Sequence, residues 1–409
     1  MTKRRRRRSA AIGLIAAAIT AVALAGSMPT AGAIPEQTTP GDTTTPVTAA
    51  QPEPAADTVD ARGPGQAPGV VYASRELPRA RMVSGAADGN AFTYWSVGAD
   101  GKPHLSTGVL MIPGGKSPSG GWPIVAWAHG SRGIADSCAP SARPVKADTD
   151  EMRRWLGRGY AVVSTDYAGV GTPGTPQYYD LDATARNIVD ALKAARDISD
   201  RLARTWVVVG EAQGASAAIH LARTAPTLQG SKLDFRGAAA TSIPAEFSSL
   251  LGSLGPGSGV MPTGLAADTL YTLSAIRNAH RDVDLNTYLT DTGKQWLGKA
   301  STLCANDLVR QASGLVMGSL FTKPLARNTA LNALLTKALA LPTKGFVRPV
   351  LMTQSLQDTS VVVPTTLKYL NDARADRRVT ARTYLTLDAT RSKQLSENDT
   401  RAFVARLLR

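Results

Sequence analysis

Apolar and polar residues alternate along the chain in two different rhythms. Short apolar runs, several of them apolar at consecutive positions, are typical of strands buried on both faces, and they lie at residues 91–97, 108–112, 124–128, 160–164, 206–209 and 350–353. Helical periodicity is found at residues 150–156, 181–198, 215–225, 365–375 and 397–408. This alternation predicts an α/β fold, in which helices cover a mainly parallel sheet.

Residues 244–341 break this rhythm with helical pieces and a Gly-rich loop at 252–259. We call this segment the cap, because we expect it to be inserted between late strands of the sheet. Its loop neither follows a strand nor ends in Gly-Lys-Ser/Thr, so it does not predict a phosphate site. Such a loop is typical of a lid that moves. We expect the domain that contains the sheet and the cap to span residues 70–409.

Two segments precede this domain. Residues 1–33 combine a run of basic residues, Lys3 to Arg8, with an apolar stretch and the small residues Ala31-Gly32-Ala33. This order is typical of a secretory signal peptide, whereas the alternative, a membrane anchor, needs about 20 apolar residues. Residues 34–69 are rich in Thr, Pro, Ala and Gly, which predicts a disordered linker stiffened by proline. We therefore expect a secreted, extracellular protein, with the export route left open.

The chain of 409 residues has 46 Lys and Arg against 32 Asp and Glu. An excess of positive charge often indicates nucleic-acid binding. Six of the basic residues, however, lie in the predicted signal peptide, which contains no acid, and the others are interleaved with acidic residues. We therefore expect no nucleic-acid partner.

The chain has two cysteines, Cys138 and Cys304. In an exported protein they favour one disulfide over the alternative of two separate thiols. Neither cysteine has the spacing of a metal ligand, and His and Asp do not cluster at such intervals. We therefore expect neither a metal nor a cofactor.

The most informative segment, residues 205–218, is a β-branched strand followed by a tight turn and an Ala-rich helix. The turn lies between Gly210 and Gly214, which is the context of the nucleophile elbow, G-x-S-x-G. Its central residue is Ala212, whose methyl group can neither lose a proton nor attack a carbonyl. No intact G-x-S-x-G occurs elsewhere in the sequence.

Residues 126–141, 159–171 and 210–214 carry a resemblance to a known family. There the chain resembles the secretory lipases of the α/β-hydrolase superfamily, which include extracellular triacylglycerol lipases of yeasts and actinobacteria. The resemblance implies the α/β-hydrolase fold and a Ser–His–Asp triad. It places the acid at Asp358, within the matching segment 350–364, although Asp358 could instead simply cap a turn. It places the histidine at Ala389, after the match at 382–388, and no His follows His280.

The resemblance also assigns an oxyanion hole to the loop at Gly130 and Ser131 and to Gln213, whose backbone N–H groups do not depend on the missing serine. Three substitutes for the lost groups are open. His129 could act as a base, Ser216 and His220 could form a displaced pair at i, i+4, and Glu211 could act on water. A serine within a helix, as Ser216 would be, usually donates a hydrogen bond to a backbone carbonyl of the same helix. We expect Glu211 to be a solvated carboxylate in the turn.

These residues favour a pseudoenzyme that has lost hydrolysis and binds a lipid or acyl ester. We expect its pocket at the C-terminal edge of the sheet, under the cap. The alternative is an active lipase or esterase that hydrolyses lipid esters with an atypical catalytic group. A third reading is a surface interaction protein that contacts the cell envelope. The sequence leaves the ligand and the oligomeric state open.

Overall fold

The computed structural model describes residues 67–178, 180–386 and 388–409, which all belong to one compact unit, Pro52–Arg409. The predicted signal peptide and residues 34–66 of the predicted linker lie outside the described residues.

The described residues contain one nine-stranded sheet with the strand order β1-β2-β3-β5-β4-β6-β7-β8-β9. The neighbouring pairs among β4 to β9 are parallel, whereas the pairs β1–β2, β2–β3 and β3–β5 are antiparallel. The predicted mainly parallel sheet is thereby confirmed. The strands are β1 (Val71–Glu76), β2 (Ala86–Val97), β3 (Pro103–Pro113), β4 (Trp122–Ala128), β5 (Ala161–Thr165), β6 (Leu202–Glu211), β7 (Asp234–Thr241), β8 (Val350–Ser355) and β9 (Val379–Tyr384).

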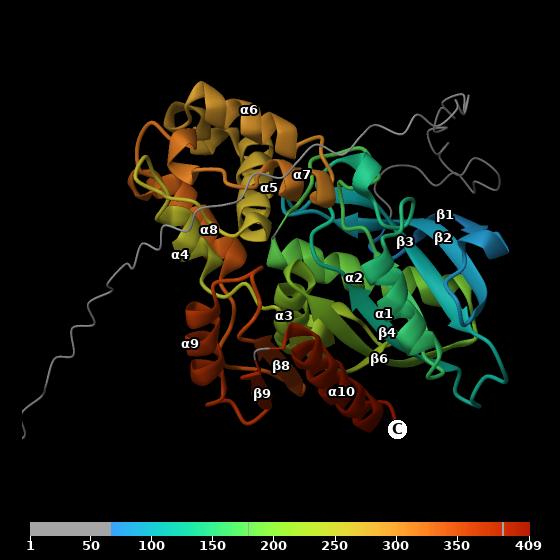
Figure 1. The fold of residues 1–409 in the computed structure, drawn as a ribbon. Coiled ribbons are helices and arrows are strands. Elements are labelled where there is room, and N and C mark those ends of the chain that lie inside the picture. The colour runs from blue at the N-terminus through green and yellow to red at the C-terminus, as the bar shows by residue number, and fades with distance from the viewer. Residues whose placement is uncertain (1–66, 179, 387) are drawn as a thin grey trace, which may run out of the picture. The chain divides into compact units, whose positions relative to one another are not determined.

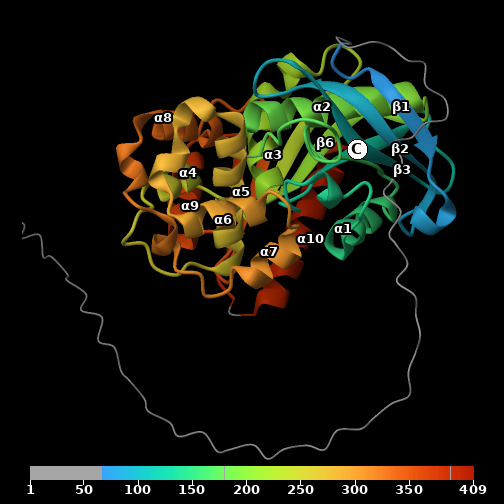
Figure 2. The ribbon, with the colours of Figure 1, turned by 90° about the horizontal axis from the view of Figure 1, so that it is seen from above.

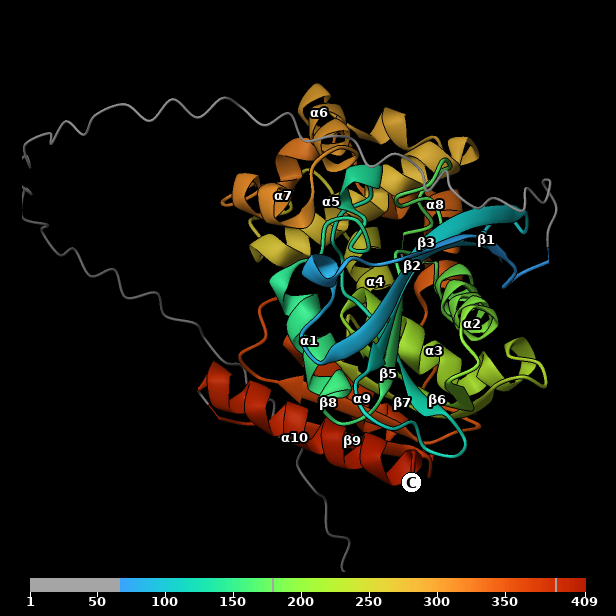
Figure 3. The same cartoon turned by 90° about the vertical axis from the view of Figure 1, so that its right-hand side faces the viewer.

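Helices cover both faces of the sheet (Figure 3). One face packs against α2 (Leu181–Ile198), α3 (Gln213–Leu228) and α9 (Val363–Ala373), and the other against α1 (Lys146–Leu156) and α10 (Ala389–Leu407). Helix α2 has the predicted bounds, and the Asp180 side chain caps it by accepting a hydrogen bond from the Ala183 N–H at 2.8 Å.

Helix α10 begins at Ala389, eight residues before the predicted start at 397. The sequence did not predict its first two turns because they lack an apolar face. In this part only Ser392 is buried, and Asp388 starts the helix by accepting a hydrogen bond from the Arg391 N–H at 3.0 Å. The longer helix brings its N-terminal end close to the ends of the central strands.

The segment between β7 and β8 contains five α-helices among the described residues: α4 (Phe247–Gly252), α5 (Thr263–Ala279), α6 (Asp291–Ala300), α7 (Ala305–Gln311) and α8 (Thr329–Leu339). They lie at the end of the unit away from β1 (Figures 1 and 2). Their apolar side chains form a core separate from those of the sheet. The predicted disulfide is present, since Cys138, after β4, is bonded to Cys304, before α7.

Candidate functional site

Ala212 lies in the turn between β6 and α3 with φ of 49° and ψ of −112°. A positive φ is uncommon outside glycine and costs conformational energy. Three backbone hydrogen bonds hold it: the Ala212 N–H donates to the Thr241 carbonyl at 3.1 Å, and the Ala215 and Ser216 N–H groups donate to the Ala212 carbonyl at 3.0 Å and 3.2 Å. The turn thus has the sharp backbone geometry of a nucleophile elbow, although its central side chain is a methyl group.

The glycines on either side make this turn possible. A Cβ on Gly210 would lie 2.1 Å from the Gly214 carbonyl oxygen, and a Cβ on Gly214 would lie 1.8 Å from the Ala128 carbonyl oxygen. No side chain fits at such distances. The two glycines therefore keep the elbow close to the end of β4.

The loop after β4 adjoins the elbow. A Cβ on Gly130 would lie 3.4 Å from the Cβ of Ala212. Ser131 follows in the same loop, and its hydroxyl is buried without a hydrogen-bond partner in the described part of the chain. Gln213, on the other side, is the buried first residue of α3. The structure thus brings the residues of the expected oxyanion hole to the elbow from two elements.

His129 is buried beside this loop, and both of its ring nitrogens face backbone carbonyls. Nδ1 lies 2.7 Å from the Gly130 oxygen and Nε2 lies 3.0 Å from the Thr165 oxygen. Its ring packs against that of Tyr167, with the centroids 4.6 Å apart. The ring of His129 is therefore held by the backbone, and neither of its nitrogens is directed at Ala212.

Asp358 lies in the turn after β8. One of its carboxylate oxygens accepts a hydrogen bond from the Ser360 N–H at 2.9 Å, and the other accepts one from Gln354 Nε2 at 3.1 Å. These bonds fix the carboxylate and also stabilise the turn. Ala389 is the exposed first residue of α10. Both residues line the same cavity.

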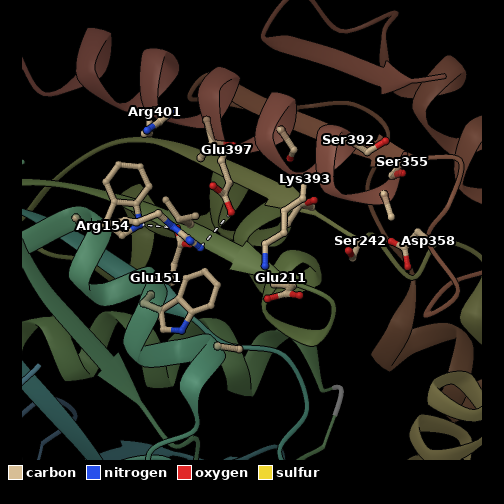
Figure 4. Close-up of a pocket in the computed structure, with 18 of the residues that line it drawn as sticks. Glu151, Arg154, Glu211, Ser242, Ser355, Asp358, Ser392, Lys393, Glu397 and Arg401 are labelled. Carbon is tan, nitrogen blue, oxygen red and sulfur yellow. Dashed lines mark hydrogen bonds and ion pairs between the residues drawn. The ribbon is translucent and has the colours of Figure 1, made fainter. Parts of the chain in front are cut away.

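This cavity, which we call the α1–α10 pocket, has a volume of about 280 Å³ and lies at the C-terminal ends of β6, β7 and β8 (Figure 4). Its walls are Trp127, Ala147, Glu151, Arg154, Trp155, Val209, Glu211, Thr241, Ser242, Ser355, Gln357, Asp358, Ala389, Ser392, Lys393, Ser396, Glu397, Thr400 and Arg401. None of these belongs to the cap. This cavity is therefore not the pocket expected under the cap, because α1 and α10 enclose it, and that expectation stays a prediction.

Glu211 was expected to be a solvated turn carboxylate, but it is partly buried in this pocket. Burial raises the pKa of its carboxyl above the usual range, and the positive charge of Arg132 opposes that effect. Lys393 of α10 extends toward Glu211 (Figure 4), and its charge also lowers the pKa of this carboxyl. The pKa of Glu211, the residue before Ala212 in the sequence, is thus raised by burial and lowered by two cations, and burial has the larger effect.

Arg154 connects the two helices that enclose the pocket. Its guanidinium group lies 3.3 Å from Glu397 of α10 and also donates to Glu151 of α1, with Nε to Oε2 at 2.9 Å. The Trp155 indole donates to the other oxygen of Glu151 at 2.8 Å. One side of the pocket is therefore held by a network of charged groups between α1 and α10.

The Ser216–His220 pair lies in α3 and lines no part of this pocket. Ser216 is buried, and His220 Nε2 is 2.8 Å from Asp182 of α2 rather than being bonded to the serine. Burial lowers the pKa of His220, and the carboxylate of Asp182 opposes this shift. These two residues link α3 to α2.

In the part of the chain that the structure describes, His, Cys, Asp and Glu form no group of three or more that could hold a metal ion. No helix in that part combines the length and the apolar character that crossing a membrane requires.

Solved structures similar to this chain include esterases and lipases. The ligand-bound form of the rice cell wall degrading esterase LipA from Xanthomonas oryzae is 22% identical, covers 84% of this chain and 99% of its own, and superposes with a TM-score of 0.66. Candida antarctica lipase A in its closed state is 18% identical over 78% of this chain and 77% of its own, with a TM-score of 0.65. At this level of identity the likeness establishes the fold, that of the α/β-hydrolases.

No curated protein matches the chain significantly. The family model of the secretory lipases matches residues 139–365, more than half of the sequence, and includes Ala212 and Asp358. The resemblance first noted in the sequence is thus confirmed, and the chain belongs to the secretory lipase family.

Proposed function

We propose that this chain is a non-catalytic member of the secretory lipase family that binds a lipid or acyl ester. The observation that carries the proposal is the elbow at Ala212, which keeps the strained backbone of a nucleophile turn around a methyl group. A methyl group has no lone pair for attack on an ester carbonyl.

The proposed roles follow the family pattern. Asp358 stands in the acid's place, Ala212 in that of the nucleophile and Ala389 in that of the histidine. Gly130, Ser131 and Gln213 supply the surroundings of an oxyanion hole. Support comes from the closeness of Gly130 to Ala212 and from the cavity that Asp358 and Ala389 share.

The size of the expected catalytic loss follows from the chemistry. In a serine-protease template, the oxyanion hole and binding alone retain about 10³–10⁴-fold acceleration over water. Full enzymes reach roughly 10⁶-fold or more. Asp358 cannot make up the difference, because its role is to orient an imidazole, and the aligned position holds Ala389.

Covalent labelling tests the proposal directly. The purified protein, incubated with a fluorophosphonate probe, should acquire no adduct in intact-protein mass spectrometry. Hydrolysis of p-nitrophenyl octanoate should stay at the buffer rate, while a fluorescent fatty-acyl probe still binds. An active family lipase treated in parallel shows that the probe is reactive. A stoichiometric adduct, or turnover that the probe abolishes, would refute the loss of catalysis.

The alternative, an ester hydrolase with an atypical catalytic group, has one specific observation in its favour. Ser242, after β7, has φ of 54° and lines the same pocket as Asp358. No hydrogen bond among the described residues, however, joins its hydroxyl to a base. Peptide mapping of any fluorophosphonate adduct decides between the two functions, since this alternative requires the label on Ser242 and its loss in Ser242→Ala.

Membership of the secretory lipase family points to an extracellular protein. We propose that residues 1–33 direct export and are removed, that residues 34–69 form a linker, and that residues 70–409 form the ligand-binding domain with the cap at about 244–341. The Cys138–Cys304 disulfide supports this location, because such bonds persist in oxidising compartments.

A further inference from the structure

A second cavity lies apart from the elbow and from the α1–α10 pocket. It has a volume of about 320 Å³ and lies between four parts of the fold: the segment that joins β1 to β2, strand β3, the loop after Cys138 and helix α1. Figure 3 shows the segment between β1 and β2, in blue, beside α1. The two cavities share no lining residue, and Ala212, Asp358 and Ala389 do not line this one. It is therefore a separate candidate for ligand binding.

Apolar side chains make up most of its lining. Nine of the fifteen lining residues are apolar, and because three of these are Met82, Met111 and Met152, we call it the methionine cavity. Met111 and Met152 belong to the buried core on this face of the sheet, and Met82 packs against that core. A bound water needs about two to four polar partners, so water is a poor occupant of the apolar part. Methionine thioethers make favourable contacts with aromatic rings, so an aromatic group matches this lining.

Arg81 supplies a positive charge at the edge of this lining. Its Nη2 donates to the backbone carbonyl oxygens of Ser141 at 3.0 Å and Ala142 at 2.9 Å, which holds the guanidinium group in place. Arg81 forms no ion pair with any residue that the structure describes, and its Nε and Nη1 donate to none of them. A charged donor forms its strongest hydrogen bonds with an anionic acceptor such as a carboxylate.

The other two charged residues of the lining already have partners. Asp148, whose side chain is 2% exposed, accepts hydrogen bonds from Arg132 Nε at 2.8 Å and Nη2 at 2.6 Å. Arg153 is paired with Asp150 of the same helix at 2.8 Å. Arg81 therefore gives the cavity an unbalanced positive charge. One negative charge on the occupant is complementary to it, whereas a second one would have no partner.

We propose that the methionine cavity binds an aromatic monocarboxylate. The ring would lie among the three methionines, and the carboxylate would accept hydrogen bonds from the unused N–H groups of Arg81. Because this site is separate from the elbow and from the α1–α10 pocket, the inference goes beyond the proposed function and does not depend on it.

Calorimetric titration of the purified chain with matched probes tests the ligand class. 2-Naphthoate and 2-naphthamide share one ring system, but only 2-naphthoate carries a negative charge. 2-Naphthoate should bind with a Kd about five- to tenfold lower, because charged acceptors form stronger hydrogen bonds with arginine. Octanoate carries the same charge on an aliphatic chain. It should bind through Arg81 more weakly than 2-naphthoate, since it has no ring to contact the thioethers.

Three variants place the binding in this cavity. Arg81→Met should raise the Kd of 2-naphthoate to that of 2-naphthamide and leave 2-naphthamide unchanged, which also shows that the cavity persists. Arg79→Met removes an exposed cation from the same short helix, Arg79–Arg81, outside the lining and should change neither Kd. Ala80→Trp adds a bulky side chain at an exposed lining position and should abolish binding of both probes. Equal thermal unfolding midpoints would establish that the variants fold alike.

The outcomes separate this inference from the proposed function. No binding of 2-naphthoate, equal Kd values for 2-naphthoate and 2-naphthamide, or no effect of Arg81→Met overturns the site. Octanoate that binds through Arg81 more tightly than 2-naphthoate overturns the aromatic assignment. 2-Naphthoate should not displace the fluorescent fatty-acyl probe, and displacement would overturn the separate site. A chain that fails to bind the fatty-acyl probe but binds 2-naphthoate through Arg81 overturns the proposed function and supports this site.

Discussion

At the scale of single residues, the strain at Ala212 is the most telling feature. A non-glycine residue held at such a φ costs of order 1–3 kcal/mol, and here the packing of Gly210 and Gly214 against their neighbours enforces it. The backbone at Ala212 therefore has the conformation expected of a nucleophile elbow, although its side chain is a methyl group.

Placing a serine and a histidine at the two proposed triad positions should produce ester hydrolysis. We expect Ala212→Ser with Ala389→His to raise p-nitrophenyl octanoate hydrolysis by at least about 10²-fold, because the oxyanion loop, the elbow and Asp358 remain in place. Each single variant should gain little, since the residues of a triad act as a unit. Initial rates of the four proteins measure this.

Adding Asp358→Asn to the restored pair serves as its control. If Asp358 is the inherited acid, the triple variant should lose most of the gain, whereas a mere turn cap would leave it. A single Ala212→Ser variant as active as the pair would contradict the assignment of Ala389.

The pKa of Glu211 makes a prediction about stability. Burial raises this pKa above the usual 4.5, so the native protein keeps the proton to higher pH than the unfolded chain does. Its contribution is fully present below pH 4.5 and is lost as the pH rises through the folded pKa. As the pH rises from 4 to 8, the Tm of Glu211→Gln should therefore rise relative to that of the wild type. A difference in Tm that is the same at both pH values would contradict this.

At the scale of secondary-structure elements, the disulfide joins the loop after β4 to the start of α7, across 166 residues of sequence. Besides the backbone, it is a covalent cross-link between the sheet, which has its own core, and the cap, which has another. The loop that carries Cys138 also carries Gly130 and Ser131, so the cross-link fixes the surroundings of the elbow as well.

Removing this bond should loosen the cap first. We expect Cys138→Ala with Cys304→Ala to lower the free energy of unfolding by about 2–5 kcal/mol. Hydrogen exchange should accelerate in α6 and α7 more than in β4 and β6. The reduced wild type should behave like the double variant. Uniform acceleration across sheet and cap would argue against two separately packed parts.

Helix α10 and strand β7 show what local patterns miss. Residues 389–396 have no apolar stripe because this part of α10 faces solvent and the pocket. Strand β7 was not predicted because its core residues are the small Ala238, Ala239 and Ala240, which carry little strand preference. Both elements are set by their neighbours, since β7 is held between β6 and β8.

At the scale of the whole molecule, the alternation of patterns predicted the fold class, six of the nine strands described and the position of the elbow, but not β1, β7 or β9. The walls of the pocket were not predictable in this way. Glu151, Arg154 and Glu397 look like ordinary solvated helix residues in the sequence. They meet only because α1 and α10 lie on the same face of the sheet.

The export of the chain is a further prediction at this scale. Residues 1–33, fused to a reporter enzyme, should direct it to the medium of an actinobacterial host, and the secreted chain should begin at Ile34. N-terminal sequencing of the secreted product checks this, with a fusion lacking Lys3 to Arg8 as the control. Retention of the intact fusion in the membrane would favour an anchor instead.

The enclosure of the pocket by α1 and α10 has a consequence for how the protein meets its ligand. Because no cap residue lines the cavity, filling it does not require the cap to swing away at an oil–water boundary. The Arg154–Glu397 contact in its wall is electrostatic, so dissolved salt should weaken this contact and change how easily a ligand enters the pocket. If the proposed ligand binds in this cavity, we expect the protein to take up single molecules from solution without first adsorbing to a lipid droplet.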